Sequence, residues 1–144
     1  MVNVGLAQAI SIGVKPKEIN IIQPIGEQIT VQLLIKNTGQ EPAMYQVYPD
    51  KYEKNISVNP GEFKLDGSEE KIINISSRWW WLGNYNSNIA IIARPLNVGS
   101  AVSVPGVKIP LTTKVTMSHL DYFIIVFTIL ALALFVLQLK RRKK

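Results

Sequence analysis

Apolar and polar residues alternate in short segments along most of the chain. From position 29 to position 35 every second residue is Ile, Val or Leu, and residues 109–117 follow the same alternation. A period of two is typical of a half-buried β-strand. Five further segments have a strand-like pattern: residues 10–14, 43–48, 56–58, 71–76 and 85–94. No helical period occurs before residue 120, so the pattern predicts seven strands.

Turn-forming residues separate these segments. Residues 37–42, 59–61 and 66–68 are rich in Asn, Asp, Gly and Pro, which supply turn conformations. Seven short strands with regular turns predict an all-β fold, a seven-stranded immunoglobulin-like antiparallel sandwich over residues 10–117. Proline has no amide hydrogen for a central ladder, so Pro110 predicts that the last strand is an edge strand or begins there.

Residues 120–139 form an apolar run with no charge between Asp121 and Lys140. A helix of this length extends about 30 Å, the thickness of the hydrocarbon layer of a bilayer. A buried core helix is the alternative, but it would need an amphipathic pattern. We therefore expect one C-terminal transmembrane α-helix. The basic tail that follows consists of Lys140, Arg141, Arg142, Lys143 and Lys144. Because cations favour the cytoplasmic side, the tail is expected inside a cell membrane, with the N-terminal domain extracytoplasmic.

An exported domain requires a signal sequence. Ala7-Gln8-Ala9 has the small-x-small form that signal peptidase cleaves. The apolar segment before it is short and lacks a basic start. We interpret residues 1–9 as the remnant of a signal peptide cleaved near Ala9, with Met1 an internal methionine of a longer signal.

Composition argues against several classes of function. The net charge is +6, but the tail holds five of the 16 Lys and Arg residues, and the rest of the chain is nearly balanced. No basic stripe supports nucleic-acid binding. The absence of cysteine excludes disulfides and thiolate metal sites. Asp66, Glu69 and Glu70 lie in a turn without the spacing of a calcium loop. No serine has the context of a nucleophile, so we expect neither a catalytic site nor a cofactor.

Three consecutive tryptophans are the second strong signal. If the strands alternate in direction, residues 78–84 lie at the pole of the sandwich next to residue 120. Indole rings there can lie at a lipid interface, contact a partner protein, or pack into the end of the sandwich. Residues 49–55 and 23–26 are expected at the same pole. The residues assigned to a membrane interface are Trp79, Trp80, Trp81, Lys51, Tyr52, Lys54 and His119, the only histidine.

At the opposite pole, residues 95–108 form a connection that is unusually apolar for a solvent loop. It includes Leu96, Val98, Val102 and Val104. Two structures fit this composition: an extra hairpin folded onto the sheet, or an exposed strand to which a partner adds by edge pairing. A disordered loop is the third possibility. These four residues form a candidate partner surface.

The order of several segments resembles a known superfamily. Val14-Lys15-Pro16 comes first, followed by a strand ending in Asn37-Thr38-Gly39, then residues 56–60 and then residues 72–75. This order resembles the immunoglobulin-like superfamily of major sperm protein and the periplasmic pilus chaperones. It looks closest to the extracellular prokaryotic branch, where such domains often precede a C-terminal membrane helix.

The resemblance implies a non-catalytic, membrane-anchored domain that binds a protein or a cell-wall polymer, or serves as a small subunit of an envelope complex. Its partners would then include the lipid bilayer. The alternative is a cytosol-facing, tail-anchored adaptor similar to the membrane-contact relatives of major sperm protein. The resemblance assigns no binding residue.

Overall fold

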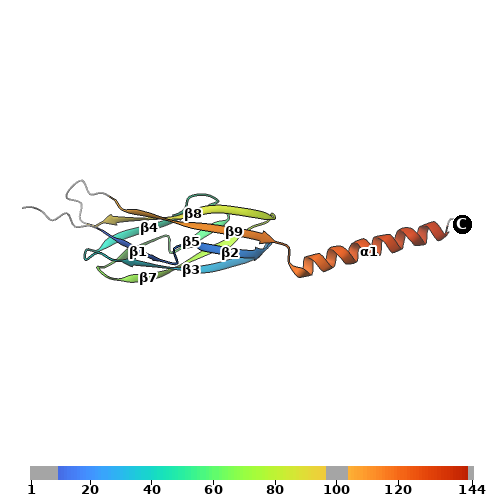
Figure 1. Cartoon of the computed structure of the whole chain (residues 1–144), viewed down its shortest axis with the longest axis horizontal. Helices are drawn as coiled ribbons and strands as arrows, with labels where there is room; N and C mark the ends of the chain where they lie inside the picture. Colours follow the sequence, from blue (N-terminus) through green and yellow to red (C-terminus); the bar gives the residue numbers. More distant parts are fainter. Residues whose placement is uncertain (1–9, 97–103, 143–144) are drawn as a thin grey trace, which may run out of the picture.

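The computed structural model describes residues 10–96 and 104–142. Two β-sheets lie face to face, and one helix follows the last strand (Figure 1). The elements are β1 (Ile12–Lys15), β2 (Ile19–Pro24), β3 (Gln28–Asn37), β4 (Ala43–Pro49), β5 (Ile56–Asn59), β6 (Glu62–Leu65), β7 (Glu70–Arg78), β8 (Gly83–Pro95), β9 (Gly106–Thr116) and α1 (His119–Arg142).

The strands divide into two sheets. The first, sheet A, has the order β1-β3-β7-β5, and the second, sheet B, has the order β2-β9-β8-β4-β6. Every described pair is antiparallel except β2 with β9, which is parallel. β1 and β2 are consecutive in the chain but belong to different sheets, so the chain crosses the sandwich at residues 16–18.

The core lies between the two sheets and follows from the period of two. Leu33 and Ile35 of β3 and Ile73 and Ile75 of β7 are fully buried, while the residues between them face outward. Sheet B supplies the opposite wall with Tyr45, Ile89, Ile91, Ala93, Ile109 and Leu111. Burial of these branched side chains is the main force that holds the sheets together, at about 25 cal/mol per Å² of apolar surface.

The seven predicted strands are all present, and the immunoglobulin-like sandwich is confirmed. The structure adds β2 and β6, which the sequence pattern did not reveal. It also corrects the prediction of a purely antiparallel arrangement, because β2 runs parallel to β9.

Pro110 lies within β9, and β9 is an inner strand of sheet B. The prediction that this strand is an edge strand or begins at Pro110 is therefore wrong. The reason for that prediction, the missing amide hydrogen of proline, still explains the pairing around Pro110. Pairing with β2 begins at Leu111, so at Pro110 the strand pairs only with β8. A residue without an amide hydrogen is tolerated at such a one-sided position.

A buried amide joins two loops at the pole remote from α1. The Asn37 side chain donates to the carbonyl oxygens of Glu41 (2.7 Å), Asp66 (3.2 Å) and Leu65 (3.4 Å) and accepts from the Gly39 amide (3.0 Å). The loop after β3 therefore packs against the loop after β6. Gly67 lies in this contact, and a Cβ atom there would fall 2.1 Å from the Gln40 carbonyl oxygen.

The prediction of a membrane span over residues 120–139 is wrong. Among the residues that the structure describes, no helix is long and apolar enough to cross a membrane.

The predictions that depended on the span are contradicted as well. They are the single-pass location, the extracytoplasmic placement of the sandwich and the tail-anchored alternative. The cytoplasmic role assigned to Lys140, Arg141, Arg142, Lys143 and Lys144 has no basis without a span. Of these, Lys140 to Arg142 belong to α1, and residues 143–144 lie outside the described residues. Residues 1–9 also lie outside them, so the signal peptide stays a prediction.

Candidate functional site

The tryptophan loop, residues 79–82, connects β7 to β8. Gly83, the first residue of β8, lies opposite Val115 near the end of β9. The loop is therefore at the pole from which α1 begins, as predicted from the alternation of strand directions. Residues 23–26 and 50–55 lie at the same pole. The Gly26 amide donates to the Trp79 carbonyl (2.7 Å), and the Arg78 amide donates to the Asn55 carbonyl (2.9 Å).

Trp79 fixes the base of this loop. Its side chain is only 3% exposed and stacks on the Tyr85 ring, with centroids 3.8 Å apart. Tyr52 meets both rings edge-on, at 5.0 Å from Trp79 and 5.8 Å from Tyr85. The Tyr85 hydroxyl donates to the Trp81 carbonyl (3.1 Å). These contacts join the loop to β8 and to the β4–β5 connection, so the backbone of the loop is held from two sides.

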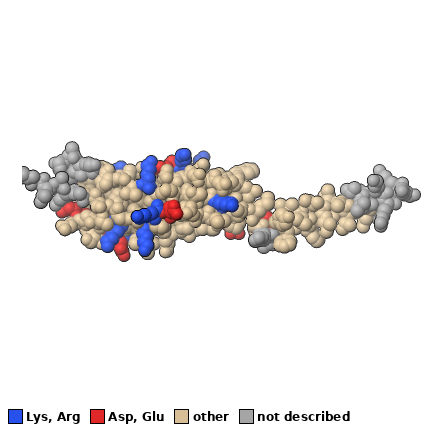
Figure 2. All heavy atoms as spheres, in the orientation of Figure 1, with Lys and Arg blue, Asp and Glu red and all other residues tan. Residues whose placement is uncertain are grey.

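The next three residues present large apolar side chains to solvent. Trp80 is 61% exposed, Trp81 78% and Leu82 47%. Trp80 leans over Gly26, because a Cβ atom at Gly26 would lie 3.4 Å from its ring. Figure 2 shows that, on the visible face, most Lys and Arg lie over the body of the sandwich, whereas the end next to α1 is largely uncharged. The exposed rings therefore form an apolar tip on a rigid support.

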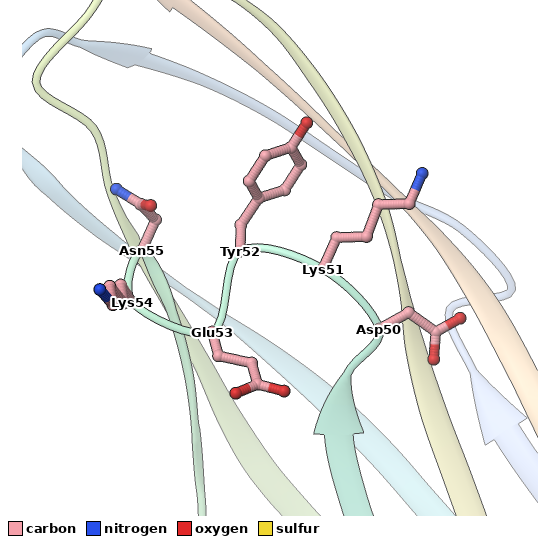
Figure 3. Close-up of a pocket in the computed structure, with 6 residues that line it drawn as sticks. All are labelled: Asp50, Lys51, Tyr52, Glu53, Lys54 and Asn55. Atoms are coloured by element: carbon pink, nitrogen blue, oxygen red, sulfur yellow. The ribbon is translucent and has the colours of Figure 1, made fainter.

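Residues 50–55 line a shallow pocket beside the loop (Figure 3). The Lys51 amide donates to the Ser87 hydroxyl (3.2 Å), and that hydroxyl donates to the Lys51 carbonyl (3.1 Å). The Asn55 side chain donates to the Arg78 carbonyl (3.0 Å). Lys51 and Lys54 are exposed, and in Figure 3 their side chains point away from each other. The pocket is open and has no convergent set of polar groups suited to a small ligand.

One ion pair ties this connection to β9. Lys108 donates to the Asp50 carboxylate at 2.7 Å. The hydrogen bond from Lys108 lowers the pKa of Asp50, and the same bond raises the pKa of Lys108. The Lys108 side chain is exposed, and water screens the pair, so its contribution to stability is small.

A buried hydrogen bond connects the two sheets just beneath the tryptophan loop. The Ser77 hydroxyl of β7 donates to the Gln23 side-chain oxygen of β2 at 2.5 Å, and both residues are buried. The Gln23 side-chain nitrogen donates to the Glu27 carbonyl (3.2 Å). A buried amide with both ends satisfied fixes the relation between its two strands. Ser77 directly precedes Arg78 and the loop, so this bond also positions the loop.

The structure divides the residues that the sequence assigned to an interface. Trp80, Trp81, Tyr52, Lys51 and Lys54 are exposed at one pole, whereas Trp79 is buried there. His119 begins α1. Sequence reasoning placed Leu82 and Gly26 at this pole, within residues 78–84 and 23–26, without assigning them to the interface, and it missed Tyr85 and Ser87. The signal for Tyr85 was an aromatic residue near the start of an alternating strand, four residues after Trp81.

The remaining candidates form no site. Leu96 and Val104 are exposed at the far pole, and Val98 and Val102 lie outside the described residues. The predicted acidic turn is internally bonded: the Glu69 carboxylate accepts from the Asp66 amide (2.8 Å), and Lys64 pairs with Asp66 (2.8 Å). Within residues 10–96 and 104–142 no group of acidic or histidine side chains is arranged to hold a metal ion.

Comparison with solved structures identifies the fold. The PapD-like domain 7 of human CEP192 superposes with a TM-score of 0.62 at 13% identity, covering 83% of this chain and 99% of that one. SSP-19 of Caenorhabditis elegans, described as an MSP-domain protein like family member, gives 0.57 at 12% identity and covers 70% and 97%. The periplasmic chaperone SfaE gives 0.57 at 15% identity and covers 75% and 61%.

These matches confirm the resemblance to the major sperm protein and pilus chaperone superfamily at the level of fold. The sequence matches no protein-family model and no curated protein.

Proposed function

We propose that this chain is a non-catalytic protein-binding module, and that the tryptophan loop is its main contact with a partner. The observation that carries the proposal is the adjacent exposure of Trp80, Trp81 and Leu82 on a support fixed by Trp79. Solvated surfaces seldom display consecutive large apolar side chains without a reason. Tryptophan is the residue type most enriched at energetic centres of protein interfaces.

The rigidity of the loop favours binding. Ordering a flexible loop costs about 0.5–1.5 kcal/mol per immobilised side chain, and this cost reduces affinity. Here the stacked pair Trp79 and Tyr85, the Tyr85 bond to the Trp81 carbonyl and the Gly26 bond to the Trp79 carbonyl fix the backbone beforehand. A partner would have to order little more than the two exposed indole rings.

The structural neighbours support the same class of function. One matched solved structure contains the Salmonella enterica SafA pilin in complex with the SafB chaperone, and another contains the CsuC-CsuE chaperone-tip adhesion subunit complex. In each of these structures a chaperone is in complex with another protein subunit. Sequence identity to the matched chains is 16% and 15%, so the neighbours support the class of function and not a particular partner.

Affinity purification of the full chain from its native host tests this proposal. We expect a stoichiometric protein to co-purify with the wild type and to be lost from the double variant Trp80→Ser, Trp81→Ser. Truncation of central aromatic residues at an interface typically costs 2 kcal/mol or more, about thirtyfold in affinity.

The matched control changes the other candidate surface. The double variant Leu96→Ser, Val104→Ser also removes two exposed apolar side chains, but at the far pole. It should retain the partner. Retention by the tryptophan variant with loss from the far-pole variant would reject the tryptophan loop and assign binding to the connection between β8 and β9.

A further inference from the structure

The outer face of sheet A carries two registered rows of uncharged polar side chains. Gln32, Asn74 and Asn59 lie side by side on β3, β7 and β5, forming an amide row. The neighbouring row consists of Thr30, Ser76 and Ser57, and the Thr30 and Ser76 hydroxyls are hydrogen-bonded at 2.8 Å. On the other side of the amide row Leu34 lies opposite Ile72, which is 55% exposed.

Charge on this face lies at the two ends of its inner strands and at its β1 edge, where Lys15 is beside Leu34. Along β7 the outward residues are Glu70, Ile72, Asn74, Ser76 and Arg78, so a carboxylate and a guanidinium lie four residues to either side of Asn74. The outer face of sheet B differs, because Lys108 and Lys114 of β9 and Arg94 of β8 are distributed along it. Two copies of a chain with net charge +6 repel each other, and the middle of sheet A is where they meet without opposing cations.

We propose that the outer face of sheet A binds the same face of a second copy, forming a symmetric homodimer. A two-fold axis along the amide row places each of its residues opposite its own counterpart. Amides suit this arrangement because each carries both donors and an acceptor. The axis reverses the strand direction, so Glu70 of one copy lies opposite Arg78 of the other, and the contact forms twice.

The remaining pairs are compatible with this axis. Ile72 falls opposite Ser76, and Lys36 of β3 falls opposite Gln28. Lys15 of β1, in the row of Leu34 and Ile72, falls opposite the row of Thr30 and Ser76, which β1 does not reach, so no cation directly faces a cation. Packed sheets rotate by about 30° relative to each other, which displaces the ends of the face by several ångströms. The long side chains of Glu70 and Arg78 can span that displacement, whereas the central amides stay close to the axis.

The dimensions of the face set the expected affinity. Eight residue steps along β7 extend about 27 Å, and four strands extend about 19 Å across. Because β1 and β5 have only four residues each, the footprint is smaller than the roughly 500 Å² per copy of that full rectangle, which places it at or below the lower end of specific interfaces. The dimer should therefore dissociate in the micromolar range.

Sedimentation velocity on the full chain tests the dimer. The protein should be produced in a host without N-glycosylation, because Asn74-Ile75-Ser76 is an acceptor triplet. We expect a reversible monomer–dimer equilibrium between about 1 and 100 μM. Glu70→Arg alone and Arg78→Glu alone should each weaken the dimer about tenfold or more, because each brings like charges together at both ends.

The double variant Glu70→Arg, Arg78→Glu is decisive. It exchanges the two charges and should restore dimerisation to within about threefold of the wild type, an outcome that simple misfolding cannot produce. Asn74→Arg should abolish the dimer, since it opposes two cations at the axis. Asn86→Arg is the matched control on the outer face of sheet B and should have no effect.

Three outcomes would overturn the proposal. The first is a monomer at every concentration. The second is association that Glu70→Arg, Arg78→Glu and Asn74→Arg leave unchanged, as contacts between the exposed apolar side chains of α1 would produce. The third is a double variant that dimerises as weakly as the single variants, although all variants unfold at the wild-type temperature.

Discussion

At the scale of single residues, buried position and close contact decide what each side chain can do. Sequence reasoning foresaw that consecutive residues of an extended segment point to opposite sides, and hence that the three tryptophans need not share one environment. It could not tell which ring is buried. Trp79 is the buried one because it packs against Tyr52 and Tyr85, which belong to the β4–β5 connection and to β8. Residues 79–82 alone contain no trace of those contacts.

Gly67 shows the same dependence on distant residues. Its sequence context, Asp66-Gly67-Ser68, predicts an ordinary solvated turn. In the structure the turn packs on the loop after β3, with the Gln40 carbonyl in the place where a side chain would be. The Asn37 amide, bonded to both loops, holds them at that distance.

Replacing Gly67 by Ala should destabilise the sandwich. The new methyl group would overlap backbone atoms of Gln40, and forcing two backbones apart costs about 1–3 kcal/mol. Thermal unfolding measures the effect as a lower midpoint. Gly61→Ala is the matched control, because a Cβ atom there lies at an ordinary 3.5 Å from its nearest neighbour, the Val47 carbonyl. Equal midpoints for the two variants would contradict the packing of the far pole.

At the scale of elements, the alternating pattern predicted strands that are long or regular and missed those that are short or begin next to turn signals. β6 has four residues between Gly61 and Asp66, so its two buried residues, Phe63 and Leu65, are too few for a period to emerge. β2 ends in Gln23-Pro24, which reads as the start of a loop. Gln23 is nevertheless buried, because Ser77 of the other sheet satisfies its side chain.

The alternation of apolar and polar residues also could not predict the parallel pairing of β2 with β9. Alternation indicates which face of a strand is buried, but it contains no information on which strand lies beside it. The same limit affected Pro110, whose place in an inner strand depends on where β2 begins to pair.

The ion pair between Asp50 and Lys108 should contribute stability that depends on pH. The pKa of Asp50 is lowered in the folded state, so its contribution is present at neutral pH and is lost as the pH falls through that lowered pKa, below the usual value of about 3.9. The pKa of Lys108 is raised, so its contribution is lost only when the pH rises through that pKa.

Asp50→Asn should therefore lower the unfolding midpoint at pH 7, and the difference from the wild type should shrink as the solution is acidified through the pKa of Asp50. The control Glu53→Gln lies in the same connection and removes a carboxylate with no ion pair among the described residues. It should leave the midpoint at pH 7 unchanged. A difference for Asp50→Asn that persists in acid would show that the ion pair is not its cause.

At the scale of the whole molecule, the sandwich was predictable and the fate of its C-terminal segment was not. The apolar composition of residues 120–139 is plain in the sequence, but the membrane span inferred from it is contradicted among the described residues. The two proposed surfaces are separate: the tryptophan loop lies at one pole, and the dimer face covers the outside of sheet A.

These surfaces can act together. A dimer with reversed strands places its two tryptophan loops at opposite ends. Such a molecule would bind two partner copies or bridge two sites. Its avidity would exceed the affinity of a single loop wherever both sites can be reached at once.

Site-specific photo-crosslinking in the native host tests most directly whether the tryptophan loop contacts a partner protein. A photoreactive phenylalanine derivative replaces Trp81 in one version of the full chain and Val104 in another, both exposed positions. We expect irradiation to join a single partner protein to position 81 and none to position 104. Cross-linking of that partner from position 104, with none from position 81, would contradict this expectation.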